Sequence, residues 1–265
     1  MTHVIVLLQA RLTSTRFPAK VLAPFCDRPM LAYQVRRLRQ AGHRVGVLIP
    51  TGEDALLALR QANVEILEVA GDENDVLGRY ARYAKAYLSP DAVIVRATAD
   101  CPLLCGTLLH DLLTQWEATP GLAYLGMGTG WPDGLADYDV FTREALFQAN
   151  SKVTVASDRE HVVPWLWRNP ECLPGETSLA LAPMWVCRRS WPKLSVDTPE
   201  DLAYVEQVAQ AVTAQCGEAY TWLNVLSTIE TTPALQRHYE SMNAAYVAQV
   251  AQEQGRTGIT WEKMR

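Results

Sequence analysis

Three positively charged side chains follow the first apolar segment of the chain at short intervals. Arg11, Arg16 and Lys20 stand five and four residues apart, with the hydroxyl residues of "LTSTR" between the two arginines. Arginine forks, a lysine ammonium and nearby main-chain N–H groups can together surround a polyanion such as a triphosphate. Residues 9–20 contain no glycine, so this segment is not a Walker loop. The alternative is structural: the arginines pair with surface carboxylates and the lysine is solvated.

Two aspartates far apart in the sequence could hold a metal ion beside that polyanion. Asp100 follows the apolar run Ala92–Val95, and Asp197 follows a short apolar piece in "LSVDTPEDL". Mg²⁺ favours one or two carboxylates together with phosphate oxygens. Asp197 is not needed to begin the next helix, because Thr198 suits the N-cap and Pro199 the first helical position. The alternative for Asp100 is that it caps the helix that follows it.

The patterns around these residues predict an α/β fold with a mostly parallel, doubly wound, Rossmann-like sheet. Uninterrupted runs rich in Val and Ile are typical of strands that helices cover on both faces. The predicted strands are Val4–Leu8, Val45–Ile49, Val64–Val69 and Ala92–Val95, and the predicted helices are Met30–Gln40, Asp54–Gln61 and Val76–Leu88. Because ligands of parallel sheets bind at the carboxyl ends of the strands, the segments after Leu8 and Val95 are expected to line one site.

The pattern changes from about residue 122, which predicts an insertion at about 122–192 within a single domain of residues 1–228. Within it, "SDREHVVPWLWRNPE" predicts a helix capped by Ser157 or Asp158, and "SLALAPMWV" predicts a strand. Strand-then-helix order returns at "LSVDTPEDL". A long amphipathic helix, Thr232–Gln254, is expected within a C-terminal helical extension, 229–265.

The composition restricts the functional classes. The 265 residues carry a formal net charge of −5, which argues against a general nucleic-acid binder, and 49% of them are hydrophobic, which is ample for a core. Six cysteines are too few for a disulfide framework; Cys101 and Cys105 are close in sequence and are expected to be bystander thiols. No secretory leader or membrane-spanning run is recognised, so a cytoplasmic protein without membrane partners is expected.

Six motifs in fixed order resemble the cytidylyltransferases that make nucleotide-activated sugars and sugar acids. The branch typified by spore coat polysaccharide biosynthesis protein F is the closer match, and the resemblance runs from about residue 3 to 210. One position departs from the family pattern: Ala19 stands where glycine is usual, which reduces the freedom of the loop backbone. The motifs are "QARLTSTRFPAKVL", "DVLGRY", "RATADCPL", "PDGLADYDVF", "REHVVPW" and "VDTPEDL".

The resemblance implies a nucleotidyltransferase-type sheet and a role for each matching residue. Arg11, Arg16 and Lys20 would hold the triphosphate, and Asp100 and Asp197 would bind Mg²⁺. The implied nucleotide-binding residues are Leu8, Gln9, Ala10, Arg11, Ser14, Arg16, Lys20, Asp75, Arg79 and Thr98. The implied acceptor-binding residues are Asp133, Asp139, Arg159, Glu160 and His161.

The reaction that these roles imply is attack of an acceptor oxyanion on the α-phosphorus of a nucleoside triphosphate, with CTP favoured, and release of pyrophosphate. Arg16 and Lys20 would stabilise the leaving pyrophosphate. If the acceptor is a hydroxyl group, His161 is a candidate to take its proton. The resemblance also implies a homodimer, built partly from the tryptophan-rich mid-chain region.

Two other functions remain open from the sequence. A metal-dependent glycosyltransferase would use an Asp-x-Asp motif, and Asp137 and Asp139 have the residue types and the spacing of this motif. A non-catalytic nucleotide-binding protein would keep the pocket without turnover. The identity of the acceptor is not predicted.

Overall fold

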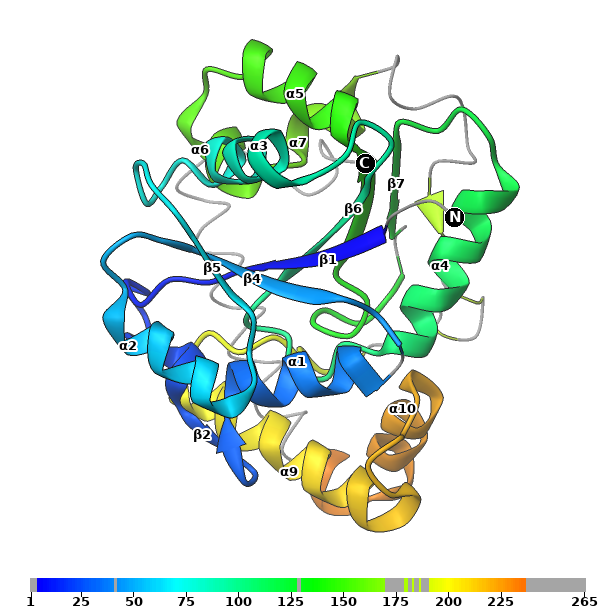
Figure 1. Ribbon diagram of the computed structural model, residues 1–265. Helices are drawn as coiled ribbons and strands as arrows, with labels where there is room; N and C mark the ends of the chain where they lie inside the picture. Colours follow the sequence, from blue (N-terminus) through cyan, green and yellow to red (C-terminus); the bar gives the residue numbers. More distant parts are fainter. Residues whose placement is uncertain are drawn as a thin grey trace, which may run out of the picture.

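A seven-stranded sheet, counted over the described residues, lies between two groups of helices (Figure 1). The structure is a computed structural model, and it describes residues 4–40, 42–127, 130–169, 179–180, 183, 186 and 191–236. The order of the strands across the sheet is β5 (Ile66–Val69), β4 (Val45–Pro50), β1 (Val4–Gln9), β6 (Val93–Thr98), β8 (Tyr138–Thr142), β7 (Tyr124–Met127) and β9 (Leu179–Ala180).

The four strands β5, β4, β1 and β6 are mutually parallel, as the sequence predicts. β1 lies at the centre, and the chain continues from it to β4 and β5 on one side and to β6 on the other. β8 is antiparallel to both β6 and β7. The sheet is therefore mostly parallel, and its strand order changes direction between β1 and β6, which is where such sheets bind ligands.

Helices cover both faces of the sheet, so the molecule has three layers (Figure 1). On one face lie α1 (Met30–Gln40), α2 (Asp54–Leu57), α4 (Gly106–Ala118), α9 (Pro199–Cys216) and α10 (Trp222–Thr231). On the other lie α3 (Val76–Tyr87), α5 (Arg143–Lys152), α6 (Ala156–His161) and α7 (Pro164–Arg168). The smaller elements are η1 (Lys20–Leu22), β2 (Pro24–Phe25), β3 (Arg28–Pro29) and η2 (Ala58–Ala62).

The central strand shows why these layers form. Val6 and Leu8 pack into the apolar cluster that includes α1 and α9, whereas Ile5 and Leu7 pack into the cluster that includes α3 and α5. All four side chains are fully buried. Each contributes about 1.5–3 kcal/mol by leaving water, so the uninterrupted apolar run is stable only with helices on both faces.

Most predicted elements are confirmed with small shifts of their ends. The predicted helix over Asp54–Gln61 is instead a short α2 followed by the tighter turn η2. The predicted cap of the mid-chain helix is wrong. α6 begins at Ala156 after the N-cap Val155, so Ser157 and Asp158 lie within its first turn.

The mid-chain region partly continues the main sheet. β7 and β8 are added to the edge of β6, and the loop between them returns to the neighbourhood of residues 194–195. Gly134 in that loop has φ +83, and a Cβ there would lie 2.1 Å from the main-chain nitrogen of Ser195. This close backbone approach requires glycine. The predicted boundary after residue 228 falls inside α10, and most of the predicted Thr232–Gln254 helix lies outside the described residues.

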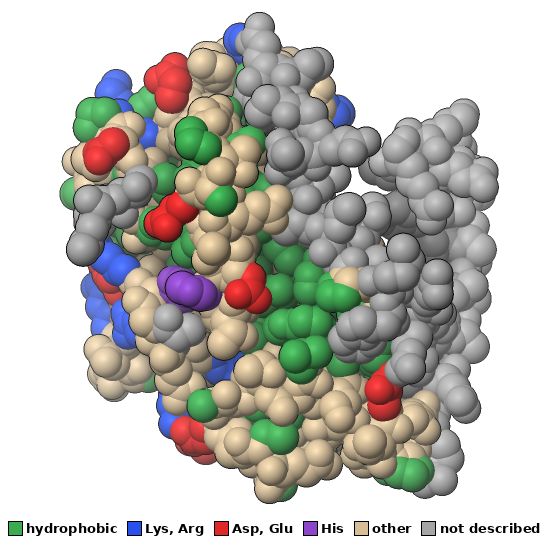
Figure 2. Space-filling model, turned by 90° about the vertical axis from the view of Figure 1, so that its right-hand side faces the viewer, with side chains coloured by type: hydrophobic (Ala, Val, Ile, Leu, Met, Phe, Trp, Pro, Cys, Tyr) green, Lys and Arg blue, Asp and Glu red, His purple; other side chains and the backbone are tan. Residues whose placement is uncertain are grey.

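Figure 2 shows the face that lies on the right of Figure 1, where hydrophobic side chains gather in one area. Trp131 and Trp222 pack edge to face, with ring centres 5.1 Å apart, and both contact a small apolar cluster that includes Cys105, the N-cap of α4, and Leu108 within α4. Within the described part of the chain, no helix is both long enough and apolar enough to cross a membrane.

Candidate active site at the carboxyl ends of β1 and β6

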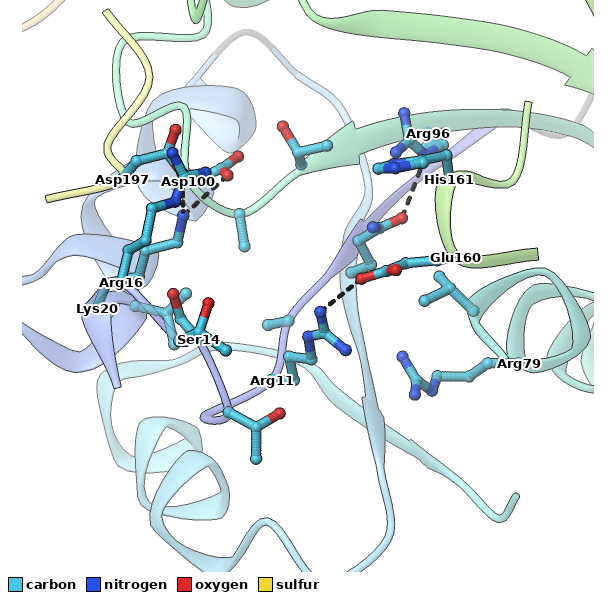
Figure 3. A pocket seen from close by; sticks show the side chains of 18 residues that line it. Arg11, Ser14, Arg16, Lys20, Arg79, Arg96, Asp100, Glu160, His161 and Asp197 are labelled. Atoms are coloured by element: carbon cyan, nitrogen blue, oxygen red, sulfur yellow. Dashed lines mark hydrogen bonds and ion pairs between the residues drawn. The ribbon is translucent and has the colours of Figure 1, made fainter. Parts of the chain in front are cut away.

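A cavity of about 400 Å³ opens at the carboxyl ends of β1 and β6 (Figure 3). Its walls come from the loop after β1, the N-terminal part of α3, the loop after β6, the end of α6 and the segment before α9. The lining residues are Gln9, Ala10, Arg11, Thr13, Ser14, Thr15, Arg16, Lys20, Val21, Val76, Arg79, Arg96, Thr98, Ala99, Asp100, Glu160, His161 and Asp197. The cavity therefore contains the predicted cations and the predicted aspartates together.

Lys20 joins the two aspartates at one end of this cavity (Figure 3). Its Nζ lies 3.0 Å from Asp100 Oδ2 and 3.2 Å from Asp197 Oδ1, and it donates to the carbonyl oxygen of Val196 at 2.6 Å. Arg16 Nη2 lies 3.1 Å from the same Asp197 oxygen. The side chain of Lys20 is only 12% exposed, so the alternative of a solvated surface lysine is wrong.

A main-chain hydrogen bond brings the two aspartates together although they are far apart in sequence. The N–H group of Val196 donates to the carbonyl oxygen of Asp100 at 2.8 Å. The chain then enters α9 through a capping box in which Thr198 and Asp201 bond each other's main-chain N–H groups, with Pro199 in the first turn. Asp100 does not cap a helix, because α4 begins at Gly106 after the N-cap Cys105.

Lys193 contacts Asp197 from the side away from the cavity. Its Nζ lies 3.0 Å from Asp197 Oδ2 and 2.6 Å from Asp201 Oδ2. Although burial of Asp197 opposes ionisation, the nearby lysines and Arg16 lower the pKa of this carboxyl below its usual value. Asp197 is therefore held as a carboxylate with one oxygen toward the cavity cations.

The loop that carries the cations contains a strained residue. Ala19 has φ 56 and ψ 24, which is the left-handed region that glycine adopts freely. Its N–H group donates to the carbonyl oxygen of Leu12 at 2.9 Å, which closes the loop before Lys20. The departure from glycine noted in the sequence thus falls on a position where the backbone favours glycine.

The other end of the cavity is formed by Arg11, Arg79, Arg96, Glu160 and His161 (Figure 3). Arg11 donates to Glu160 Oε1 and to Asn74 Oδ1, both at 2.6 Å. Arg79 is 1% exposed and donates to the main-chain oxygen of Glu73 at 2.7 Å; it forms no ion pair with any described residue. Burial accordingly lowers its pKa, as expected for a cation without a compensating charge.

Arg96 lies in the floor of the cavity and was not predicted to belong to the site. Its Nε donates to Gln9 Oε1 at 3.1 Å, and its Nη1 donates to Asp139 Oδ2 at 3.0 Å. Tyr124 donates to the other Asp139 oxygen at 2.7 Å. Because the register places Arg96 opposite Asp139 on β6 and β8, the pair follows from the antiparallel addition of β8.

The donor set beside Lys20 fits a hard divalent cation. Asp100 Oδ2 and Asp197 Oδ1 converge on one ammonium nitrogen, so both could contact an ion at that position. The described residues include no group of three Asp, Glu, His or Cys side chains able to hold a metal. Two carboxylates completed by substrate oxygens are the arrangement that Mg²⁺ prefers.

Comparison with known proteins identifies the family. The family model described as cytidylyltransferase matches residues 5–220. The chain belongs to the cytidylyltransferase family. A cytidylyltransferase structure from Leptospira borgpetersenii serovar Hardjo-bovis matches it with a TM-score of 0.75 and 25% sequence identity, covering 89% of this chain and 97% of that chain. The mostly parallel fold of this family member thus agrees with that of a cytidylyltransferase.

Two further proteins are similar to this cytidylyltransferase. The uncharacterized protein MJ1063 of Methanocaldococcus jannaschii is 30% identical over 201 residues, which cover 75% of this chain and 79% of that protein. CMP:2-keto-3-deoxy-manno-octonic acid synthetase complexed with CTP matches with a TM-score of 0.54 and 15% identity, over 81% of this chain and 99% of that chain. The second likeness concerns the fold alone.

Some predicted site residues support the cavity of this cytidylyltransferase without lining it. Leu8 is fully buried in the core. Asp75 caps α3 by accepting from Gly78 N, and it also accepts from Arg159 Nε at 2.8 Å. Asp133 accepts from Ser195 Oγ at 3.1 Å. With Asp139 held by Arg96 and Tyr124, the residues outside the lining are Leu8, Asp75, Asp133, Asp139 and Arg159.

The Asp-x-Asp pair does not form one site. Asp139 is engaged by Arg96 and Tyr124, whereas Asp137 Oδ2 accepts from the main-chain nitrogen of Gly134 at 2.6 Å. Burial and the neighbouring Asp133 carboxylate raise the pKa of Asp137 to about 7. Neither aspartate lines the cavity, so the geometry gives no support to the glycosyltransferase alternative.

Proposed function

We propose that this cytidylyltransferase transfers CMP from CTP to an oxygen of a small-molecule acceptor, releases pyrophosphate, and uses Mg²⁺ held by Asp100 and Asp197. The observation that carries the proposal is the shared position of Lys20 between these two aspartates, in a cavity that Arg11 and Arg16 also line. Family membership supports CTP as the donor, and the related synthetase was solved in complex with CTP.

The residues of this chain would act mainly by position and charge. Arg16 and Lys20 would hold the β- and γ-phosphates and stabilise the negative charge that develops on the leaving pyrophosphate. Arg11 would exchange its contact with Glu160 for a phosphate oxygen, because a guanidinium fork binds phosphate as well as carboxylate. Bound Mg²⁺ would neutralise charge on the α-phosphate and orient the attacking oxygen.

The acceptor is expected at the end of the cavity formed by α6, β6 and the start of α3. Glu160 and His161 line that end, and both were predicted to contact the acceptor. A carboxylate or phosphate acceptor arrives ionised and needs no base, whereas a hydroxyl acceptor would lose its proton to His161. Membership of the spore coat branch, action on a sugar or sugar acid for polysaccharide synthesis, and a homodimer remain part of this proposal.

The decisive assay is release of pyrophosphate by the purified protein with Mg²⁺, tested with CTP, UTP, ATP and GTP against a panel of sugars, sugar acids and phosphorylated acceptors. We expect release with CTP in the presence of one acceptor class, together with a CMP–acceptor product in the mass spectrum. Formation of free CDP from a CDP-sugar would instead indicate glycosyl transfer. CTP binding by calorimetry without turnover for any acceptor would contradict the proposal and support a non-catalytic protein.

A further inference from the structure

Asp197 is bonded by two lysines at nearly equal distances. Lys193 Nζ lies 3.0 Å from Asp197 Oδ2, and Lys20 Nζ lies 3.2 Å from Asp197 Oδ1. The same carboxylate thus meets two ammonium groups of equal charge, one at each oxygen. Their surroundings differ, and this difference indicates different roles.

Lys193 is a fixed partner of Asp197. It does not line the cavity, and its second contact is with Asp201 Oδ2 at 2.6 Å. Asp201 is itself held by the N–H groups of Asp197 and Thr198 in the capping box of α9. Removing Lys193 from this position would leave the buried Asp201 carboxylate without its cation, so exchange of Lys193 is costly.

Lys20 stands in surroundings that would also suit a metal ion. Its ammonium is enclosed by one oxygen each from Asp100, Asp197 and the Val196 carbonyl, at 2.6–3.2 Å. Carboxylate and carbonyl oxygens are the ligands of hard divalent cations. Lys20 is also part of the cavity wall and is the first residue of the short element η1, which follows the loop after β1.

We propose that the Lys20 ammonium fills the divalent-cation position of the nucleotide-free protein and leaves it only when a triphosphate draws the side chain away. This inference rests on the proposed function, because it uses the same two aspartates as the cation ligands. An ammonium group between the two carboxylates excludes a divalent cation in two ways. It occupies the position that the cation would take, and its positive charge weakens the attraction of the carboxylates for the cation. A bound triphosphate offers Lys20 a more highly charged partner within reach of the same loop. The free protein therefore binds divalent cations weakly, and the cation and CTP enter together.

The test is a calorimetric titration of the nucleotide-free protein with Mn²⁺, a hard cation that accepts the same oxygen ligands. The titration measures the dissociation constant for Mn²⁺. We expect Lys20→Met to bind Mn²⁺ about tenfold more tightly than the wild type, because the space between the two half-buried carboxylates is then vacant and Asp100 has lost its ion-pair partner. Lys193→Met is the matched control, since it removes the same charge from the same carboxylate without vacating the cavity position. We expect its Mn²⁺ affinity to change less than about threefold.

Each other outcome overturns the proposal. Equal tightening in Lys20→Met and Lys193→Met would show that charge alone matters and that Lys20 does not occupy the cation position. Unchanged or weaker Mn²⁺ binding in Lys20→Met, with an unaltered thermal unfolding midpoint, would show that no cation site lies under Lys20. If Lys20→Met is unstable, Lys20→Gln provides the same comparison. The titration contains neither CTP nor acceptor, so failure of CMP transfer would not alter its result.

Discussion

The two ends of the cavity balance their charges in different ways. At the end that holds Lys20, both cations meet carboxylates: Lys20 contacts Asp100 and Asp197, and Arg16 contacts Asp197. At the opposite end, Arg79 is almost fully buried and no described carboxylate pairs with it. A buried cation without a partner costs several kcal/mol. The charges of the first end are therefore paired in the free protein, whereas under the proposed function an anionic group of the ligand would pair with Arg79 at the second.

The largest effect is expected from the carboxylates of the Lys20 end. Asp100→Asn keeps the size of the side chain but removes its charge, and kcat should fall about a hundredfold to a thousandfold, ~3–4 kcal/mol of barrier. Steady-state pyrophosphate release measures this. Asp111→Asn on the exposed side of α4 is the charge-matched control and should match the wild type. If kcat of Asp100→Asn lies within about threefold of the wild type, the Asp100 carboxylate does not take part in catalysis.

The next effect concerns the Arg79 end. Arg79→Met should raise the KM for CTP about tenfold, since a hydrogen bond to a charged group contributes about 1.5–3 kcal/mol. The free energy of unfolding should stay the same or increase, because an unpaired buried charge is removed. Arg82→Met, one turn along α3 and 42% exposed in its ion pair with Asp75, is the control that should leave KM unchanged. Loss of stability without a change in KM would show that Arg79 is only structural.

A smaller effect is expected in the loop that carries Lys20. Ala19→Gly should increase the free energy of unfolding by about 1 kcal/mol, because Ala19 has the positive φ that glycine adopts without strain. Urea denaturation gives this difference. Ala23→Gly is the control: Ala23 has φ −57 and ψ 141, so the added chain entropy should lower stability there. If both changes destabilise the protein equally, the conformation of Ala19 carries no strain.

The smallest effect concerns Asp137, a half-buried acid near the Lys20 end. Its pKa is raised to about 7 by burial and by Asp133, so between about pH 4 and about pH 7 the folded protein binds more protons than the unfolded chain. Stability should therefore fall as the pH rises through the folded pKa. Asp137→Asn should lose less stability than the wild type between about pH 5 and about pH 8, measured by urea denaturation with divalent cations chelated. An identical pH dependence in both proteins would place the pKa of Asp137 near its usual value.

The Lys20 end could be predicted from the sequence, whereas the Arg79 end could be predicted only in part. Asp100 lies just beyond the end of an apolar strand, and such positions converge at one edge of a parallel sheet. Arg96 lies inside a strand, and its side chain is held at the cavity by an ion pair with Asp139 on the neighbouring antiparallel strand. The sequence did not predict an antiparallel strand beside β6, so it did not indicate this pairing. The one signal for Arg96 was a charged residue within an otherwise apolar strand.

Contacts between residues far apart in the sequence explain why two predicted acceptor-binding residues do not line the cavity. Asp139 and Arg159 were assigned to the acceptor pocket, but their charges are taken by Arg96 and Asp75. Nothing local to these residues distinguishes a ligand contact from such a structural ion pair. The error in the predicted helix start is a local one: Ser157 and Asp158 suit an N-cap, yet the N-cap is Val155, without a side-chain hydrogen bond.

The bond between Lys20 and Asp197 spans 177 residues of the chain. During synthesis, the N-terminal strands and the segment with Arg16 and Lys20 leave the ribosome long before Asp197 does, so a nascent chain carries these two cations before Asp197 is available to pair with them. The Lys20 end of the cavity is completed only when the segment leading into α9 docks beside Asp100.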